Sequence, residues 1–315
     1  MSDTRTVALA QIAPVWLDRD ATLRKVEAWT ARAADRGAHL VCFGEALVPG
    51  YPFWVEHTDG ARFEDRRQKE LYAHYLDQGV DPDVHLEPLA ALARERGVTV
   101  VLGCMERAFD RGGHSLYCAM VVIDDGGVIH PCHRKLVPTH EERLVWAPGD
   151  GHGLVCHALP PFTLGGLNCW ENWLPLPRAA LHAQGEDLHV ALWPGNRRNT
   201  EDVTRFLARE GRSYVLSVAG LMRRADVPDH VPHAAALRAA LPETPADGGS
   251  CVAAPDGTWL VEPVVGQEEL VTAELEHAFV RRERHNFDHS GHYGRPEILH
   301  VELDRTRHRA LRERE

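Results

Sequence analysis

The chain has 315 residues, of which 44% are hydrophobic and 26% are charged. These values are typical of globular proteins and exclude a disordered or fibrous chain, and the length suffices for a substantial core. The formal net charge of -11 opposes a surface that neutralises phosphate groups, so we expect no nucleic-acid partner.

The apolar segments of the chain are all too short to span a bilayer. The first residues also lack a cationic stretch followed by a long apolar run, which is the pattern of a secretory signal. We therefore expect a soluble, cytoplasmic protein with no membrane partner.

Seven cysteines are scattered along the chain without a CxxC pair. This odd number and spacing argue against a disulfide framework and against a thiolate zinc site. We expect most of these cysteines to be buried as small apolar side chains.

Short apolar runs alternate with segments in which apolar residues recur at helical spacing. In chain order, the pattern predicts a strand at 6–12, a helix at 20–36, a strand at 39–43, helices at 64–76 and 85–96, a strand at 98–102, a hairpin of 115–124 with 128–133, a strand at 162–168, a helix at 176–184, a strand at 188–193, a helix at 202–212, and strands at 214–219, 250–254 and 259–261. Helices between single strands indicate βα units, and the hairpin indicates antiparallel strands, so the sequence predicts a mixed α/β layered fold.

The chain has no segment with the composition of a long linker, and we predict a single domain over residues 1–315. Residues 225–249 are rich in Ala, Pro and Asp, and we expect them to form an excursion at the surface of that domain.

A glycine-bearing strand leads directly into Cys169, in the stretch 165–172 (GGLNCWEN). We expect this thiol to lie on a turn before a helix-forming stretch. The partial positive charge at the start of that helix, together with free backbone N–H groups, would favour the thiolate. The same N–H groups are suited to hold an oxyanion.

Charged residues follow two other predicted strands. A nucleophilic thiol needs a base, and the charge that develops on its substrate needs a partner. Glu45 follows the strand 39–43, Lys135 follows the hairpin, and Glu142 comes seven residues after Lys135. Taken singly, such residues are more often helix caps or exposed surface charges.

Glu45, Lys135 and Cys169, in this order and in these settings, resemble the Glu–Lys–Cys triad of the nitrilase superfamily. The match is closest to the nitrilase branch, and it extends from about Val7 to Pro296. Further stretches that fit this branch are 48–52 (VPGYP), 133–135 (HRK), 138–139 (PT), 142–143 (ER), 149–151 (GDG), 168–171 (NCWE), 292–293 (HY) and 295–296 (RP). One departure is Gly44, where the family often has proline.

The resemblance implies a four-layer α-β-β-α sandwich in which the site residues converge at strand ends. It implies that Cys169 is the nucleophile, Glu45 the base and Lys135 a donor to the tetrahedral species. Glu142 is expected to orient water or the substrate nitrogen. The implied reaction converts a nitrile to the carboxylic acid and ammonia through a covalent thioimidate and thioester, and it requires no cofactor or metal.

Four tryptophans lie near the implied site residues in the sequence. They are Trp54, Trp146, Trp170 and Trp193. Core packing is one interpretation of them. The other is an apolar pocket that holds the organic part of a small-molecule nitrile.

Other activities share this triad. An amidase or carbamoylase of the same superfamily, or a cyanide-degrading hydratase or dihydratase, would carry the same residues, although Trp170 and Glu171 after the nucleophile favour a nitrilase. A catalytically silent binding protein is a more distant alternative, which the intact triad opposes. The choice among aliphatic, aromatic, arylacetic and dinitrile substrates depends on the shape of the pocket.

A metal site at His285, His289 and His292 is a rival interpretation, since their spacing is that of ligands on a helix. Asn286, Asp288 and Gly291 oppose a helix there. The resemblance instead makes this segment a structural motif near the C-terminus.

The resemblance also implies self-association through the helices at 176–184 and 202–212. We expect a homodimer or small homo-oligomer, with the segment at about 285–315 at an interface. Long spiral assemblies in this branch draw partly on C-terminal extensions, and this sequence stops at Glu315.

Overall fold

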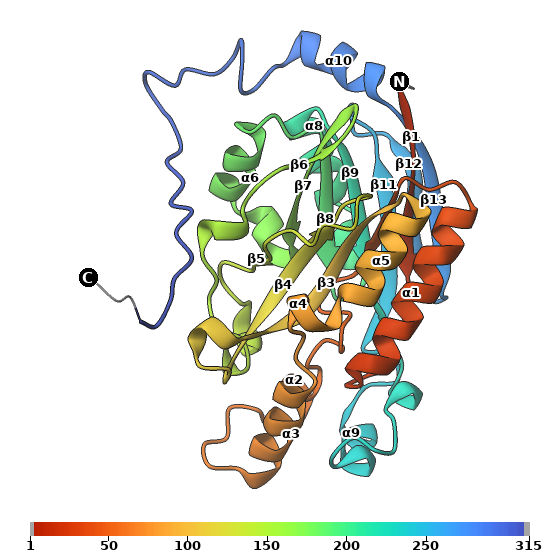
Figure 1. Cartoon of the computed structure of the whole chain (residues 1–315), viewed down its shortest axis with the longest axis vertical. Helices are drawn as coiled ribbons and strands as arrows, with labels where there is room; N and C mark the ends of the chain where they lie inside the picture. The colour runs from red at the N-terminus through yellow and green to blue at the C-terminus, as the bar shows by residue number, and fades with distance from the viewer. Residues whose placement is uncertain (1–2, 312–315) are drawn as a thin grey trace.

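A computed structural model of the chain describes residues 3–311. Two β-sheets lie face to face, and helices cover the outer side of each (Figure 1). The strands of the first sheet, in spatial order, are β13 (Glu269–Glu276), β1 (Thr4–Gln11), β2 (Leu40–Phe43), β3 (Thr99–Ala108), β4 (Ser115–Ile123) and β5 (His133–Arg134). Those of the second sheet are β10 (Leu221–Met222), β11 (Ala246–Ala253), β9 (Tyr214–Ala219), β8 (Leu188–Trp193), β7 (Phe162–Asn168) and β6 (His157–Leu159), with β12 (Trp259–Val265) paired to β11.

Both sheets are mixed, as the sequence predicted. β1, β2 and β3 run parallel, and β13, β4 and β5 extend them with antiparallel pairs. In the second sheet β7, β8 and β9 run parallel, while β6 and β11 are antiparallel to their neighbours. Parallel strands end at the same edge of a sheet, so β7 ends beside β8. A backbone hydrogen bond from Glu45 to Trp193 joins the end of β2 to the end of β8, which brings the loops after β2 and β7 to the same side of the sandwich.

Three apolar layers hold the fold together. α1 (Arg19–Asp35) and α5 (Glu87–Arg96) pack on the first sheet through residues such as Val26, Leu89 and Val100. The inner faces of the sheets meet through residues such as Leu9 and Val190. On the far side, α8 (Val203–Gly211) packs on the second sheet, and α6 (Pro175–His182) lies beside it. The structure thus confirms the four-layer α-β-β-α sandwich.

The remaining helices lie mainly around the edges of the sandwich. They are α2 (Trp54–His57), α3 (Arg66–Asp77), α4 (Pro82–His85), α7 (Arg197–Thr200), α9 (Ala234–Ala240) and α10 (His277–Asn286), with the 3₁₀ turns η1 (Phe109–Arg111), η2 (His140–Leu144), η3 (Gly151–Gly153), η4 (Cys169–Trp173) and η5 (Arg224–Asp226). None of the helices within residues 3–311 combines the length and the apolar character needed to cross a membrane.

Several predicted elements need correction. The second strand of the predicted hairpin, 128–133, is reduced to a bridge at Ile129 and the short β5. Pro131 lies between them, and because it has no N–H it interrupts the strand.

Residues 225–249 are also more than a surface excursion. They include η5, α9 and the start of β11, and Leu237 and Leu241 are buried in the same cluster as Trp54.

From the end of α10 to residue 311, the C-terminal segment has no helix or strand and runs back along the body of the molecule (Figure 1). Its end is fixed to the body at Asp150, which accepts from the guanidinium of Arg307 at 3.1 Å and the backbone N–H of His308 at 2.9 Å. The predicted interface segment, 285–315, reaches four residues, 312–315, that lie outside the described residues.

Candidate active site

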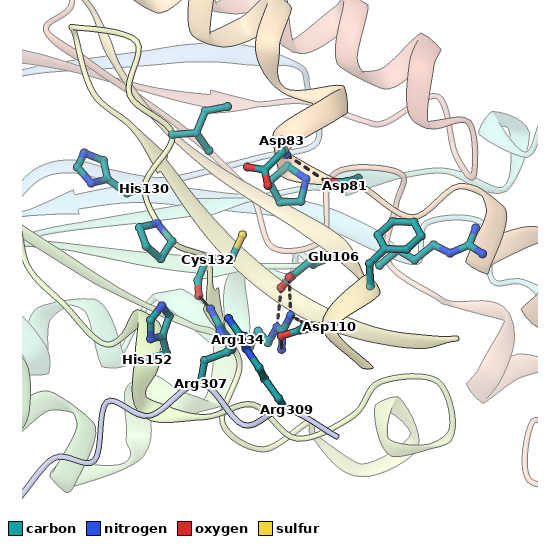
Figure 2. Close-up of a pocket in the computed structure, with 15 residues that line it drawn as sticks. Asp81, Asp83, Glu106, Asp110, His130, Cys132, Arg134, His152, Arg307 and Arg309 are labelled. Atoms are coloured by element: carbon teal, nitrogen blue, oxygen red, sulfur yellow. Dashed lines mark hydrogen bonds and ion pairs between the residues drawn. The ribbon is translucent and has the colours of Figure 1, made fainter. Parts of the chain in front are cut away.

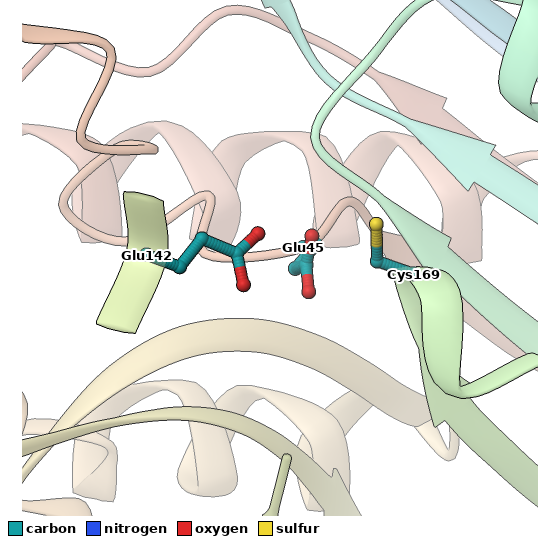
Figure 3. A group of neighbouring side chains, drawn as sticks. All are labelled: Glu45, Glu142 and Cys169. Atoms are coloured by element: carbon teal, nitrogen blue, oxygen red, sulfur yellow. The ribbon is translucent and has the colours of Figure 1, made fainter. Parts of the chain in front are cut away.

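Four side chains that the sequence singled out meet in one buried cluster. Lys135 Nζ donates to Glu45 Oε1 at 2.8 Å and to Glu142 Oε2 at 2.7 Å. Figure 3 shows Glu45 between Glu142 and Cys169, and one oxygen of each carboxylate and the Cys169 sulfur all lie within 4.8 Å of one another. Because the Lys135 ammonium lies between the two carboxylates, the cluster contains its own cation.

Glu45 is fixed by the loop that follows β2. Its backbone N–H donates to the carbonyl oxygen of Trp193 at 3.1 Å, which ties the end of the first sheet to the end of β8. Gly103 of β3 makes room for this loop. A Cβ at Gly103 would overlap the carbonyl oxygen of Gly44 and lie 2.8 Å from the Cα of Glu45, so a side chain there would displace the loop.

Lys135 follows β5, whose position is set by an ion-pair network. Figure 2 shows the Arg134 guanidinium, which pairs with Glu106 at 2.6 Å and with Asp110 at 2.9 Å. These groups line a cavity of about 450 Å³ that is separate from Cys169. On the other side, the backbone N–H of Lys135 donates to the carbonyl oxygen of Cys118 at 2.8 Å. The segment that carries Lys135 is therefore fixed by the ion pairs of Arg134 and by a backbone hydrogen bond to β4.

Cys169 begins η4 directly after β7, in a left-handed conformation with φ of 47°. This region is unfavourable for a residue with a side chain, so its neighbours must stabilise it. The side-chain amide of Asn172 does so by donating to the carbonyl oxygens of Cys169 at 2.8 Å and Leu167 at 3.2 Å. Its oxygen in turn contacts a ring nitrogen of the buried His189 at 2.7 Å.

Glu171 connects the turn that carries Cys169 with the segment that carries Lys135. Its carboxylate accepts from the backbone N–H groups of Leu136 at 2.6 Å and Asn168 at 2.9 Å, and it contacts His133 at 3.0 Å. Burial would raise the pKa of Glu171, but His133 and these N–H groups lower it, so the group is a carboxylate at neutral pH. Sequence reasoning used Glu171 only as a family marker.

Two further residues support Glu142. The hydroxyl of Tyr51 donates to Glu142 Oε1 at 2.8 Å, and the backbone N–H of Thr139 donates to Oε2 at 2.6 Å. Sequence reasoning quoted Tyr51 and Thr139 as parts of motifs but gave them no contact in the site. Nothing in the local sequence of Tyr51 indicates its partner, because Tyr51 lies 91 residues from Glu142. Thr139 and Glu142 instead form a capping box, which the T-x-x-E spacing could have indicated.

Burial and charge set the protonation of the cluster. Burial raises the pKa of Glu45, the Lys135 ammonium opposes this, and Glu142 adds to it, with a result of about 7. Burial alone would lower the pKa of Lys135, but Glu45, Cys169 and Glu142 raise it well above its usual range. Lys135 is therefore an ammonium, and Glu45 titrates near neutral pH, where a general base is most effective.

The N–H of Trp170 in the turn lowers the pKa of Cys169, as expected, but the net shift is in the opposite direction. Burial and the charges of Glu45 and Glu142 raise the pKa of Cys169 well above its usual range, and Lys135 and the Trp170 N–H only partly offset this. The following helix is a 3₁₀ turn of five residues, which is too short for a strong dipole. At rest the nucleophile is therefore a thiol that must give up its proton.

Cys169 borders an open cavity of about 1170 Å³. The wall includes aromatic and proline side chains, namely Tyr51, Phe53, Trp170, Pro194, Pro242 and Pro245. Its polar part is formed by Glu56, His57, Thr139, His140, Glu141, Glu142, Arg143, Asn196, Arg197, Arg198, Asn199 and Asp247. Most of these residues lie in loops and short turns. The sequence did not single out the part of the wall between Pro194 and Asp247.

The four predicted pocket tryptophans occupy different places. Trp170 borders the cavity and is 57% exposed. Trp54 and Trp146 are buried in the cluster behind Tyr51, and Trp193 is buried behind Cys169. Of the four tryptophans, Trp170 alone is among the described residues of the cavity wall. The positions of the other three match the core-packing interpretation.

The three histidines of the rival metal site do not converge within the described residues. α10 ends at Asn286, so only His285 lies on a helix. A ring nitrogen of His289 contacts the carbonyl oxygen of Gly211 at 2.9 Å, and His292 faces Asp288 at 3.4 Å.

Comparison with known proteins agrees with this geometry. The profile of the family described as carbon-nitrogen hydrolase matches residues 6–284. A "Nitrilase 2" from an unknown prokaryotic organism is 36% identical over 304 residues, which cover 96% of this chain and 93% of that protein. An "Aliphatic nitrilase" from Rhodococcus rhodochrous is 33% identical over 96% of this chain and 80% of its own.

Solved structures show the same fold. An amidase from Nesterenkonia sp. superposes with a TM-score of 0.64 and 20% identity, over 90% of this chain and 95% of the amidase. A carbon-nitrogen hydrolase from Helicobacter pylori gives a TM-score of 0.64 at 17% identity, over 90% of this chain and 93% of that protein.

The chain belongs to the carbon-nitrogen hydrolase family, and it is a hydrolase that acts on carbon–nitrogen bonds. Within this family its similarity to nitrilases extends over almost the whole chain, which confirms the resemblance found in the sequence.

Proposed function

We propose that this hydrolase converts an organic nitrile to the carboxylic acid and ammonia, with Cys169 as the nucleophile. The observation that carries the proposal is the buried contact of Lys135 with both Glu45 and Glu142, beside Cys169, which borders the cavity. The similarity to nitrilases over about 95% of the chain supports the choice of a nitrile.

In the proposed reaction, Glu45 takes the proton of Cys169 as the sulfur attacks the nitrile carbon. Glu45 passes this proton to the nitrile nitrogen, which gives a thioimidate, and water then adds to the thioimidate carbon. The resulting tetrahedral carbon carries hydroxyl, amine and sulfur. Loss of ammonia leaves a thioester, and a second water releases the acid and restores the thiol.

The surroundings of the tetrahedral carbon favour loss of ammonia over loss of the thiolate. Expulsion of nitrogen requires that the amine be protonated, and Glu45 can relay the proton of the hydroxyl group to it. Glu142 places a second carboxylate beside the leaving nitrogen, which favours its ammonium form. Lys135 stabilises charge on the oxygen. We therefore expect the acid as the main product.

The size of the cavity bears on the substrate. A volume of about 1170 Å³ exceeds what hydrogen cyanide needs and is slightly above the usual range of small-molecule sites, about 300–1,000 Å³. This supports an organic nitrile over cyanide.

Nitrile hydration to the amide is the second candidate. It is favoured by a relative from Nicotiana tabacum that is named a bifunctional nitrilase/nitrile hydratase and is 34% identical over 95% of this chain. An amidase or carbamoylase activity is a third possibility, since the solved structures with this fold include amidases.

Ammonia release from a panel of aliphatic, aromatic and arylacetic nitriles and amides tests the proposal. The expected result is ammonia from at least one nitrile, with the acid dominant by chromatography throughout the time course. Amide that accumulates and is not consumed would indicate a hydratase. Turnover of amides alone would indicate an amidase.

We also propose self-association through the outer face of α6 and α8. Trp173, Leu176 and Phe206 on this face are each at least half exposed, and such apolar groups favour an interface. Light scattering at working concentration is expected to give a dimer or larger species, and a monomer would contradict this. A cytoplasmic location remains a prediction from the sequence.

A further inference from the structure

The two carboxylate oxygens of Glu45 have different surroundings. Oε1 accepts from Lys135 Nζ at 2.8 Å and from the thiol of Cys118 at 3.3 Å. Oε2 is buried, and no donor within the described residues reaches it. A buried acceptor without a partner is costly, so the difference between the two oxygens calls for a functional reason.

Cys118 is suited to act as a lasting donor. It lies on β4 in the buried cluster that contains Ala46 and Trp146, and it is absent from the wall of the cavity. Burial and the charge of Glu45 raise the pKa of Cys118 well above its usual range, so the thiol keeps its proton. Its carbonyl oxygen accepts the backbone N–H of Lys135 at 2.8 Å, so one residue contacts both charged partners of the pair.

We propose that Cys118 is a positioning residue that, together with Lys135, holds Glu45 through Oε1 and leaves Oε2 as the oxygen that takes the proton of Cys169. The role in turnover rests on the proposed function, whereas the contacts do not. A rotation of the carboxylate that moved this oxygen away from Lys135 and Cys118 would break two hydrogen bonds.

The pH dependence of the site isolates this contact. The groups that face Glu45 are Lys135 after β5, Glu142 on η2, Cys169 on η4 and Cys118 on β4, with the hydroxyls of Tyr51 and Tyr75 farther away. A hydrogen bond to the carboxylate favours its charged form, so loss of the Cys118 donor raises the pKa of Glu45 above about 7. The acid limb of the activity profile then moves to higher pH.

Three variants separate the hydrogen bond from the volume of the sulfur. Cys118→Ala removes the donor, Cys118→Ser keeps a donor in a similarly reduced volume, and Cys104→Ala removes another buried thiol that has no contact with Glu45. In Cys118→Ala we expect the acid limb of kcat/KM to rise by about half a pH unit, a shift typical of a weak hydrogen bond. Cys118→Ser and Cys104→Ala are expected to match the unmodified enzyme.

A second measurement does not depend on the substrate. Alkylation of Cys169 by iodoacetamide, followed by peptide mass spectrometry across pH, also requires a base for the thiol proton. It is expected to show the same shift in Cys118→Ala. If no nitrile or amide is turned over, the proposed function fails while this alkylation profile still tests the role of Cys118.

An equal shift in Cys118→Ala and Cys118→Ser would overturn the proposal, because it would indicate a volume effect. An unshifted Cys118→Ala would overturn it as well. If Cys118→Ala does not fold, Cys118→Val fills the space without a donor, and the same upward shift is expected.

Discussion

The buried centre of the site and the mouth of its cavity are built in different ways. The centre is almost fully buried, and in it Lys135 contacts both Glu45 and Glu142. Each of these residues lies close to the end of a strand or on a short turn. At the mouth, Arg143 and Arg198 are exposed, on the 3₁₀ turn η2 and on the single-turn helix α7. The centre determines the reaction, whereas the mouth is free to vary with the substrate.

This difference predicts that changes at the centre reduce the rate and changes at the mouth alter substrate affinity. The following variants test that division, beginning with those of largest effect.

Glu45→Gln and Lys135→Ala should each lower kcat/KM by at least about a hundredfold, because one removes the base and the other an oxyanion donor. Lys135→Ala also leaves two buried carboxylates without their cation, and we expect it to cost about 3–5 kcal/mol of stability. Steady-state kinetics and thermal unfolding measure the two effects. Near-normal turnover by Glu45→Gln would mean that another group is the base.

Gly103→Ala tests whether the position of the Glu45 loop matters. Since the new methyl group would overlap the Gly44 carbonyl oxygen, the loop must shift, and a displacement of about 1 Å can cost up to a hundredfold in rate. We expect a loss of at least about tenfold in kcat, together with a lower melting temperature. Gly126→Ala is the matched control, because its nearest neighbour is the side chain of Asp124 on an exposed turn. Equal activity of the two variants would argue against a tightly fixed base.

The pKa of Glu45 predicts how activity depends on pH. Since the base must be a carboxylate, and since its pKa is raised to about 7, activity is present above this value and is lost as the pH falls through it. Below pH 7 we expect kcat/KM to fall roughly tenfold per pH unit. A profile that stays flat down to pH 5 would show that burial does not raise this pKa.

Trp170→Ala tests the mouth of the cavity. Its side chain borders the cavity and is 57% exposed, so its loss should raise KM about two- to tenfold while kcat changes little. Phe63→Ala is a suitable control, since Phe63 is an aromatic residue that is 89% exposed and is absent from the cavity wall. A large fall in kcat for Trp170→Ala would indicate that this residue acts at the reacting centre and not at the mouth.

The sequence predicted the parts of the molecule that depend on local pattern. β7, β8 and β9 begin and end where predicted because each is a short apolar run buried in the second sheet. β13 and α10 were missed because their exposed faces carry Glu and Arg, which obscure the apolar periodicity. The four clustered side chains were identified through motifs that resemble a known family.

The features that the sequence did not predict arise from distant partners. Cys118 contacts Glu45 across 73 residues, and Asn172 contacts His189 across 17. The direction of the Cys169 pKa shift was also missed, since it depends on burial and on two carboxylates from other parts of the chain. Such effects exist only once the two sheets have packed together.

The central claim is that Cys169 forms the covalent intermediate. The most direct test is to quench the enzyme in acid during turnover of a slow nitrile and to map the added mass by peptide mass spectrometry. We predict that the imidate or acyl mass is found on the peptide that contains Cys169, and that Cys169→Ala folds normally but shows neither adduct nor turnover. An adduct on Cys104, Cys118 or Cys251 instead, or ammonia release by Cys169→Ala, would contradict the account.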